Sequence, residues 1–411
     1  MKLKTTLLLT TMIGLISGCG NFQSFDYSGS GKKESADNGN SGDAKGKPPE
    51  SKTPGKEVKQ PSEPIVIKKP EEPKPGEETK PMIIDTAFDT GTPQCVENKI
   101  VEEFGSPFRP YILDETLDDY LTKEVKTYTD FQTLADLILR EVVDTDGLID
   151  YGRLRTDLSV QWKKVANTLP NGDILANFRT SEEDKMAFWS NIYNLKMIDL
   201  VVENPNVAKS LDLPGEDGAL VFDTPFELAG ITVTLNQLEK GILGVGEPGD
   251  PAKKRDFNGI EVKELEPRLH FTVVCGALSC PKLRNFLYRP EHMKKVLREN
   301  SLIVANTAGF FRPFLNTEFD EVEMWANPLF DQFYPTDFEI LYGKNWVNLP
   351  NFFLDECRTD KNVLNDVIAD AEESGEGIFF AVSSYNWLVN DVTNRPKKID
   401  LEKDWDNVLV K

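Results

Sequence analysis

The sequence predicts an α+β fold, with one large mixed domain of helices and sheet after a disordered, proline-rich linker. Apolar residues recur three and four positions apart in several segments, which is typical of amphipathic helices. Short β-rich runs are interspersed among these segments in mixed order. All six tryptophans lie after residue 93, so the apolar core belongs to the later part of the chain.

Several helices are predicted from this periodicity. They cover residues 111–125 and 130–143, a segment from Ser181 to Asn204, a segment beginning near Pro290, and residues 362–374. Between the first two and the third, residues 144–154 partly resemble a calcium-binding loop. An EF-hand aligned on Gly147 needs acids at both ends, where this chain has Val142 and Arg153. We therefore predict an ordinary Asp/Gly turn.

Strands are predicted at four places. Residues 219–243 read as two strands and a helix capped at Asn236, and residues 269–274 read as a third strand. Further strands are expected near residues 320–324 and over 378–384, with a short helix over 328–333 between them.

The helix after Ser181 is apolar over most of its circumference, which predicts a central, buried position. Ser181 and Asp184 have the spacing of a capping box at its start. Asn191 and Asn194 lie together inside it, and buried amides must be hydrogen-bonded. We expect them to hold the backbone, with a ligand-binding role as the alternative.

The N-terminus predicts export and lipidation. Residues 1–19 combine a basic start, an apolar stretch too short to span a bilayer, and small residues before Cys19. Ile16–Cys19 resembles the bacterial lipobox, so we expect a signal peptide and an acylated Cys19. Gly20 follows where an aspartate would resemble an inner-membrane retention signal. The expected location is therefore the outer membrane or cell envelope, facing the periplasm or the cell surface.

Residues 20–92 are predicted to be a disordered linker, followed by a globular domain over 93–411. Nine prolines lie between Pro48 and Pro81, and the segment contains no Trp or Leu. Such a chain cannot bury enough apolar surface to offset its ordering entropy. The net charge of −21 falls almost wholly on the globular part. An acidic surface of this kind repels phosphates, which excludes nucleic acid as a partner.

The segment 268–283 contains His270, Cys275 and Cys280, which are candidates for a reactive thiol and its base. In a regular strand, His270 and Cys275 face opposite sides, about 16 Å apart at about 3.3 Å per residue. A base must lie within about 3.2 Å of the thiol that it activates. The strand prediction therefore separates this pair. His292, the other histidine, is a further candidate for the base of Cys280, and it is the less favoured of the two histidines.

Disulfides are the alternative use of the cysteines. Four remain after lipidation of Cys19, and an even number in an oxidising compartment favours pairing, with three connectivities open. The pairing that we favour joins Cys275 to Cys280 across a small-residue turn and Cys95 to Cys357. Two cysteines and two histidines match no standard zinc spacing, so neither a metal nor another cofactor is predicted.

Five stretches, "MAFWSNIYNLKMIDLV", "ITVTLNQLEKGIL", "EPRLHFTVVCGALSCPKL", "NPLFDQFYPTDF" and "YNWLVND", resemble in this order the motifs of the uncharacterised family named domain of unknown function 547. The resemblance runs from about residue 150 to 390. Asn386 stands where the family more often has an aspartate. The resemblance implies a shared fold and a polar cluster, and no defined reaction. The family signature falls on Phe188, Trp189, Asn191, Tyr193, Asn194, Arg268, His270, Cys275, Cys280, Pro281, Tyr385, Trp387 and Asn390.

The sequence thus favours an envelope lipoprotein whose domain binds or scaffolds without catalysis, with an envelope protein or glycan as partner. The alternative function is a cysteine-dependent hydrolase or transferase. It would use Cys275 or Cys280 with a histidine, and Asn191 or Asn194 would orient that base.

Overall fold

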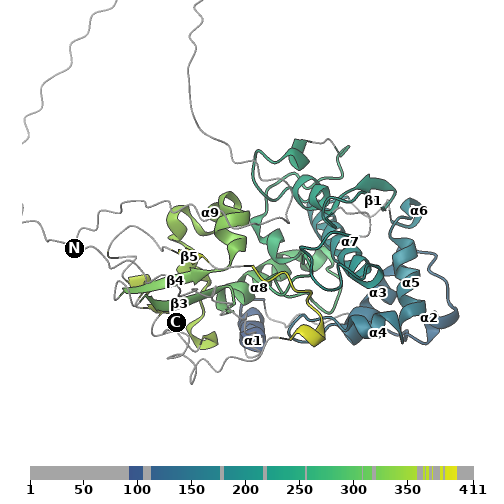
Figure 1. The fold of residues 1–411 in the computed structure, drawn as a ribbon, viewed down its shortest axis with the longest axis horizontal. Coiled ribbons are helices and arrows are strands. Elements are labelled where there is room, and N and C mark those ends of the chain that lie inside the picture. Colours follow the sequence, from purple (N-terminus) through teal and green to yellow (C-terminus); the bar gives the residue numbers. More distant parts are fainter. Residues whose placement is uncertain are drawn as a thin grey trace, which may run out of the picture. The chain divides into compact units, whose positions relative to one another are not determined.

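Helices and two small sheets make up the described part of the chain, as the α+β prediction requires (Figure 1). The computed structural model describes residues 92–104, 113–175, 180–215, 220–254, 257–307, 309–316, 321–358, 364–365, 367–369, 373, 380–382 and 385–395. The predicted signal peptide, Cys19 and the linker up to residue 91 lie outside these ranges. None of the helices described is both long enough and apolar enough to cross a bilayer.

The helices and strands follow one another in mixed order. The helices are α1 (Thr92–Phe104), α2 (Asp119–Thr122), α3 (Tyr128–Val142), α4 (Tyr151–Arg155), α5 (Ser159–Thr168), α6 (Gly172–Leu175), α7 (Glu182–Glu203), α8 (Met293–Asn306) and α9 (Pro335–Tyr342). The strands are β1 (Phe226–Leu228), β2 (Ile231–Val233), β3 (Phe311–Asn316), β4 (Glu321–Ala326) and β5 (Phe380–Val382).

Helix α7 is the central helix of the larger core, as predicted. Ser181 accepts a hydrogen bond from the Asp184 amide at 3.0 Å, and the Asp184 carboxylate accepts one from the Ser181 amide at 2.9 Å, which confirms the capping box. The helix ends before Asn204. Helices α4, α5 and α8 contact it, so side chains around most of its circumference are buried.

A three-stranded sheet lies over a second, aromatic core. Strand β4 is central, with β3 antiparallel on one side and β5 parallel on the other. The strands expected near 320–324 and 378–384 are thus present, and residues 329–333 are helical. Rings of large side chains fill this core, and their stacking favours offset and edge-to-face contacts. They include Phe271, Phe311, Phe330, Phe338, Tyr342 and Trp346.

The predicted strand over residues 269–274 is wrong. Residues Pro267–Phe271 form a 3₁₀ turn instead, begun by Pro267 and by the Glu266 carboxylate, which accepts from the Arg268 amide at 3.1 Å. The alternating apolar residues face two different cores, because Leu269 and Val273 pack in the larger core and Phe271 packs in the aromatic one. The apolar residues of this segment therefore alternate because the segment lies between two cores.

Side-chain amides take the place of a neighbouring strand along this segment. Asn194 of α7 donates to the Thr272 carbonyl and accepts from the Val274 amide, both at 2.8 Å. Asn300 of α8 donates to the Phe271 carbonyl, also at 2.8 Å. Buried backbone groups must be paired, and here two helices provide the partners. The segment is thereby held in a coiled form.

The predicted helix over 111–125 is wrong over most of its described length, since α2 comprises four residues. Lys164 of α5 donates to the carbonyls of Tyr120 and Lys123 at 2.7 and 2.8 Å, and its ammonium group takes up acceptors that a longer helix would use. Residues 144–148 form the expected turn, in which the Asp144 carboxylate accepts from the Asp146 and Leu148 amides.

The helical segment after the β1–β2 hairpin begins two residues earlier than predicted. Thr234 and Gln237 bond each other's backbone amides at 3.0 and 3.1 Å, which makes Thr234 the capping residue. Asn236, the predicted cap, makes no capping bond and donates to Asp223 at 2.7 Å. Residues Gln237–Ile242 are wound as a π-helix.

Candidate functional site

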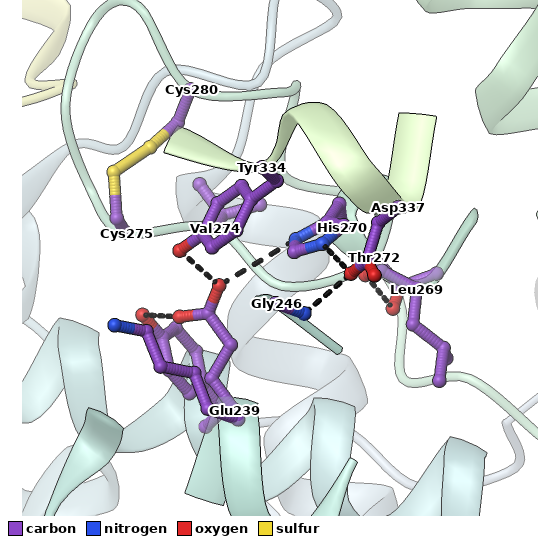
Figure 2. A network of polar contacts seen from close by, with 12 residues as sticks. Glu239, Gly246, Leu269, His270, Thr272, Val274, Cys275, Cys280, Tyr334 and Asp337 are labelled. Atoms are coloured by element: carbon purple, nitrogen blue, oxygen red, sulfur yellow. Dashed lines mark hydrogen bonds and ion pairs between the residues drawn. A yellow bond between two sulfur atoms is a disulfide. The ribbon is translucent and has the colours of Figure 1, made fainter. Parts of the chain in front are cut away.

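His270 lies at the centre of a buried network of polar side chains (Figure 2). The residue is 2 % exposed, and its Nε2 lies 2.8 Å from Oδ2 of Asp337. Its Nδ1 lies 3.7 Å from Oε1 of Glu239, which is an ionic contact. The imidazole stacks on the Tyr334 ring, with centroids 3.9 Å apart. Both ring nitrogens thus face carboxylates.

Glu239 joins this histidine to two tyrosines. Its Oε1 accepts a hydrogen bond from the Tyr334 hydroxyl at 2.8 Å, and its Oε2 accepts one from the Tyr193 hydroxyl of α7 at 3.2 Å. Glu239 lies in the π-helix Gln237–Ile242, and Tyr334 directly follows a second π-helix, Leu329–Phe333. π-Helical turns are rare in proteins, and those that occur are often found at functional sites. Both of these π-helices lie at this network.

Asp337 reaches the network from the first turn of α9. Its carboxylate also accepts a hydrogen bond from the Gly246 amide. Gly246 has φ of +93°, and a Cβ atom there would approach side-chain atoms of Lys240 and Tyr334 at 3.3 and 3.6 Å. A side chain at this position would therefore be strained and crowded, which explains a glycine beside the carboxylate.

The charges of the network stabilise one another. Burial by itself lowers the pKa of His270, but Asp337 and Glu239 outweigh burial and raise the pKa above its ordinary 6.5. Burial raises the pKa of Glu239, but His270, Tyr334 and Lys240 hold it below its ordinary 4.5. The contacts with the two carboxylates therefore favour the imidazolium form of His270.

A disulfide and a tyrosine form a second feature beside this network. Cys275 is bonded to Cys280, and Figure 2 draws this bond together with the network. The Tyr385 hydroxyl lies 3.3 Å from the sulfur of Cys275 and 3.0 Å from that of Cys280. Cys95 and Cys357 form the other disulfide, so the structure has the pairing that we favoured from the sequence.

Part of this arrangement lies in a segment that matches the model of a known protein family. Residues 178–302 match the family model described as "Protein of unknown function, DUF547". No curated protein and no solved structure matches the chain. The DUF547 match is shorter than the expected range of 150–390. It covers α7, Glu239, His270 and both cysteines of the short disulfide, and it ends within α8.

Two asparagines of the expected DUF547 signature hold the backbone, whereas the side chains of Asn390 and Arg268 contact other side chains. Asn191 donates to the Tyr288 carbonyl at 2.9 Å and accepts from the Tyr288 amide at 2.8 Å. Asn194 does the same for residues 272–274, so neither asparagine orients a base. Asn390 accepts from the Tyr151 hydroxyl at 3.0 Å. Arg268 forms an ion pair with Glu266 at 2.6 Å.

The candidate thiol and base are not joined in the structure. The contacts of His270 are carboxylates and aromatic rings, whereas Cys275 and Cys280 contact each other and Tyr385. The strand prediction kept His270 and Cys275 apart because they would face opposite sides. The segment is coiled, so that reason does not apply, and the two side chains instead have different contact partners. His292 lies in the short 3₁₀ turn before α8 and is partly exposed. Within the described residues, no three His, Cys, Asp or Glu side chains form a group that could hold a metal ion.

Sequence reasoning missed Glu239, Tyr334 and Asp337, three members of the network. Glu239 lies inside the DUF547-like stretch "ITVTLNQLEKGIL", and the other two lie inside "NPLFDQFYPTDF". The signal was their presence within motifs, but no local pattern relates them to His270. Tyr334 and Asp337 also lie beyond the segment that matches DUF547.

Proposed function

We propose that this chain is a lipid-anchored protein of the bacterial cell envelope whose globular domain binds another envelope protein without catalysis. One observation carries the non-catalytic assignment. The cysteines of the central motif are joined to each other, and both nitrogens of His270 face carboxylates. A thiol hydrolase or transferase needs a free thiolate beside a base. The cysteine-dependent alternative therefore lacks its activated nucleophile.

The binding surface that we propose is the aromatic face, defined as Phe333, Tyr385 and Trp387. The three rings are partly exposed, and Leu388, the next residue after Trp387, is 46 % exposed. The Tyr385 ring lies 4.5 Å from that of Trp387 and 5.2 Å from that of Phe333, measured between centroids. Exposed Trp and Tyr rings are enriched at protein interfaces and act there as anchors.

The aromatic face rests on a rigid support, which favours binding. The backbone after Tyr385 is bonded to the loop between Cys275 and Cys280, through the Leu278 amide on the Leu388 carbonyl at 2.8 Å and the Asn390 amide on the Gly276 carbonyl at 2.8 Å. A pre-ordered surface loses less entropy on association. The net charge of −21 favours a partner with a neutral or basic surface over an anionic one.

The anchor is tested by mass spectrometry of the protein recovered from bacterial membranes. We expect the mature chain to begin at an acylated Cys19, and a Cys19→Ser variant to leave the membrane fraction. Acyl chains contribute about 0.8 kcal/mol per buried methylene, so loss of the acyl groups should release the chain. An unmodified N-terminus at another residue would contradict the anchor.

The partner is tested by photo-crosslinking in cells, with a photoreactive residue at Leu388 and, as a control, at Ile340. Ile340 is 58 % exposed on α9 and is not part of the aromatic face. We expect one discrete protein adduct from position 388 and none from 340. With that purified partner, Trp387→Ala should weaken binding by about 30-fold, the loss of one interface anchor of about 2 kcal/mol.

Three results would contradict this proposal. One is the absence of an adduct at position 388, and another is an adduct that proves to be a glycan. The third is turnover of a peptide, ester or glycan by the purified chain that a Cys275→Ser variant abolishes.

A further inference from the structure

We propose that the Cys275–Cys280 disulfide is redox-active and exchanges electrons with a cysteine pair of the protein bound at the aromatic face. The other disulfide, Cys95–Cys357, is structural. The inference rests on the proposed function only for the identity of the natural reductant. The reducibility of the bond depends on the surroundings of its sulfurs.

The two sulfurs differ in accessibility. Cys275 is partly exposed, whereas Cys280 is 4 % exposed. Thiol–disulfide exchange requires in-line attack on one sulfur while the other leaves. An incoming thiolate therefore reaches Cys275, and Cys280 is the leaving group.

The Tyr385 hydroxyl is placed to stabilise that leaving group. It lies 3.0 Å from the Cys280 sulfur and can donate a hydrogen bond to the thiolate as it forms. Hydrogen bonds to charged groups are stronger than those between neutral groups. Since a more stable thiolate leaves faster, this hydroxyl favours reduction of the bond. Tyr385 belongs to the aromatic face, so the bound protein lies beside the bond.

The loop between the cysteines is held independently of the bond. Its Gly276 carbonyl and Leu278 amide are bonded to residues 390 and 388, and Ser279 Oγ accepts from the Asn386 amide at 2.8 Å. Asn327 donates to the Ser279 carbonyl at 3.1 Å. These hydrogen bonds keep the two sulfurs near each other when the bond is open, so opening is reversible.

Cys95–Cys357 is an internal comparison. It also joins a partly buried cysteine to a buried one, since Cys357 is 6 % exposed. Both disulfides pack against apolar side chains, among them Val96, Ile100 and Leu302 around Cys95–Cys357. Among the described residues, a hydroxyl group lies within hydrogen-bond distance of the sulfurs of Cys275 and Cys280 and of neither sulfur of Cys95–Cys357. Apolar surroundings disfavour the thiolate that reduction must release. Similar exposure and different polarity predict different reducibility.

The exchange balances as two successive displacements. A first thiolate of the partner attacks the sulfur of Cys275, the Cys275–Cys280 bond breaks, and Cys280 leaves as a thiolate that accepts a hydrogen bond from the Tyr385 hydroxyl. A second thiolate of the partner then attacks the partner's first sulfur, which is joined to Cys275 in the mixed disulfide, and Cys275 leaves as a thiolate. The partner gains a disulfide and loses two electrons, and this chain gains two thiols after protonation.

The first test equilibrates the full chain with mixtures of reduced and oxidised dithiothreitol, traps free thiols by alkylation, and maps them by mass spectrometry. We expect Cys275 and Cys280 to be reduced at a ratio of reduced to oxidised reagent at least about a hundredfold lower than Cys95 and Cys357 require. Simultaneous opening of both bonds, or opening of the short one only in denaturant, would overturn the proposal.

The second test compares reduction rates in Tyr385→Phe and in Tyr342→Phe, a matched change in the aromatic core. Tyr385→Phe keeps the ring and removes the hydroxyl, so we expect reduction by dithiothreitol to slow about tenfold. Tyr342→Phe should reduce at the rate of the unmodified chain. Equal rates in all three chains would remove the assigned role of the hydroxyl.

The third test identifies the attacked sulfur and the partner. A Cys280→Ala variant, which keeps the accessible Cys275, should form a mixed disulfide in cells with the protein that crosslinks at position 388. Cys275→Ala should not. Trapping of an unrelated protein would overturn the assigned reductant, whereas the dithiothreitol results test the redox activity whether or not a partner binds.

Discussion

Replacement of His270 by alanine is expected to lower the free energy of unfolding by about 3–5 kcal/mol. The change leaves the carboxylates of Glu239 and Asp337 buried with no imidazolium between them, and it removes the ring that stacks on Tyr334. Urea unfolding of the full chain, followed by tryptophan fluorescence, measures the loss.

The control for this prediction neutralises the network as a whole. In a chain with His270→Leu, Glu239→Gln and Asp337→Asn, none of these three positions carries a buried charge, so a large part of the lost stability should return. A cost below about 1 kcal/mol for His270→Ala would show that the buried ion pairs contribute little to folding.

His270 and Glu239 also make the free energy of unfolding depend on pH, and the sign of this dependence follows from the direction of each pKa shift. The raised pKa of His270 gives stability that is complete below about pH 6.5 and is lost as pH rises through the folded-state pKa. The lowered pKa of Glu239 gives stability present above about pH 4.5 and lost as pH falls through its folded-state pKa. Between pH 6 and 8.5, unfolding free energy should therefore fall in the unmodified chain and in His292→Gln, and fall less in His270→Gln.

Removal of the Cys95–Cys357 disulfide is expected to cost about 4–5 kcal/mol, among the largest effects of any change in the described structure. The two cysteines are 262 residues apart, and a bond that closes so long a loop restricts the unfolded chain strongly. The bond also ties α1 to the 3₁₀ turn Asp355–Cys357, where Cys95 and Cys357 pack with Val96 and Ile100. Denaturation of the Cys95→Ala/Cys357→Ala variant measures the cost.

The short disulfide provides the matched control. Cys275 and Cys280 are five residues apart, so their bond restricts the unfolded chain less, and its removal should cost about 2 kcal/mol. The Cys275→Ala/Cys280→Ala variant should therefore be the more stable of the two. The reverse order would mean that the short bond, and not the long one, holds the domain together.

Local signals in the sequence predicted many of the elements correctly. The capping box at Ser181, the stop before Asn204 and the start of the helix near Pro290 all depend on residues a few positions apart. The same holds for β4 and β5 of the three-stranded sheet, whereas β3 was not predicted. Such signals act through neighbouring backbone groups, so they are readable without the tertiary structure.

Alternation of apolar residues misled where the chain passes between two cores. Leu269, Phe271 and Val273 alternate as in a strand, but they face different cores, and Asn194 and Asn300 bond the backbone of the segment. Alternation of apolar residues shows which side chains are buried. It does not show whether the backbone of the segment is paired with another strand. The side-chain amides that replaced a neighbouring strand come from helices elsewhere in the chain.

The sequence by itself predicted the α+β class and the central helix α7, and it favoured one cysteine pairing among the three that it left open. Only the tertiary structure placed Glu239, Tyr334 and Asp337 around His270. His270 and Asp337 are separated by 67 residues, and Glu239 and Tyr334 by 95. A helix or strand arises from contacts between near neighbours, whereas a buried charge needs partners that only the packing of distant segments can bring to it.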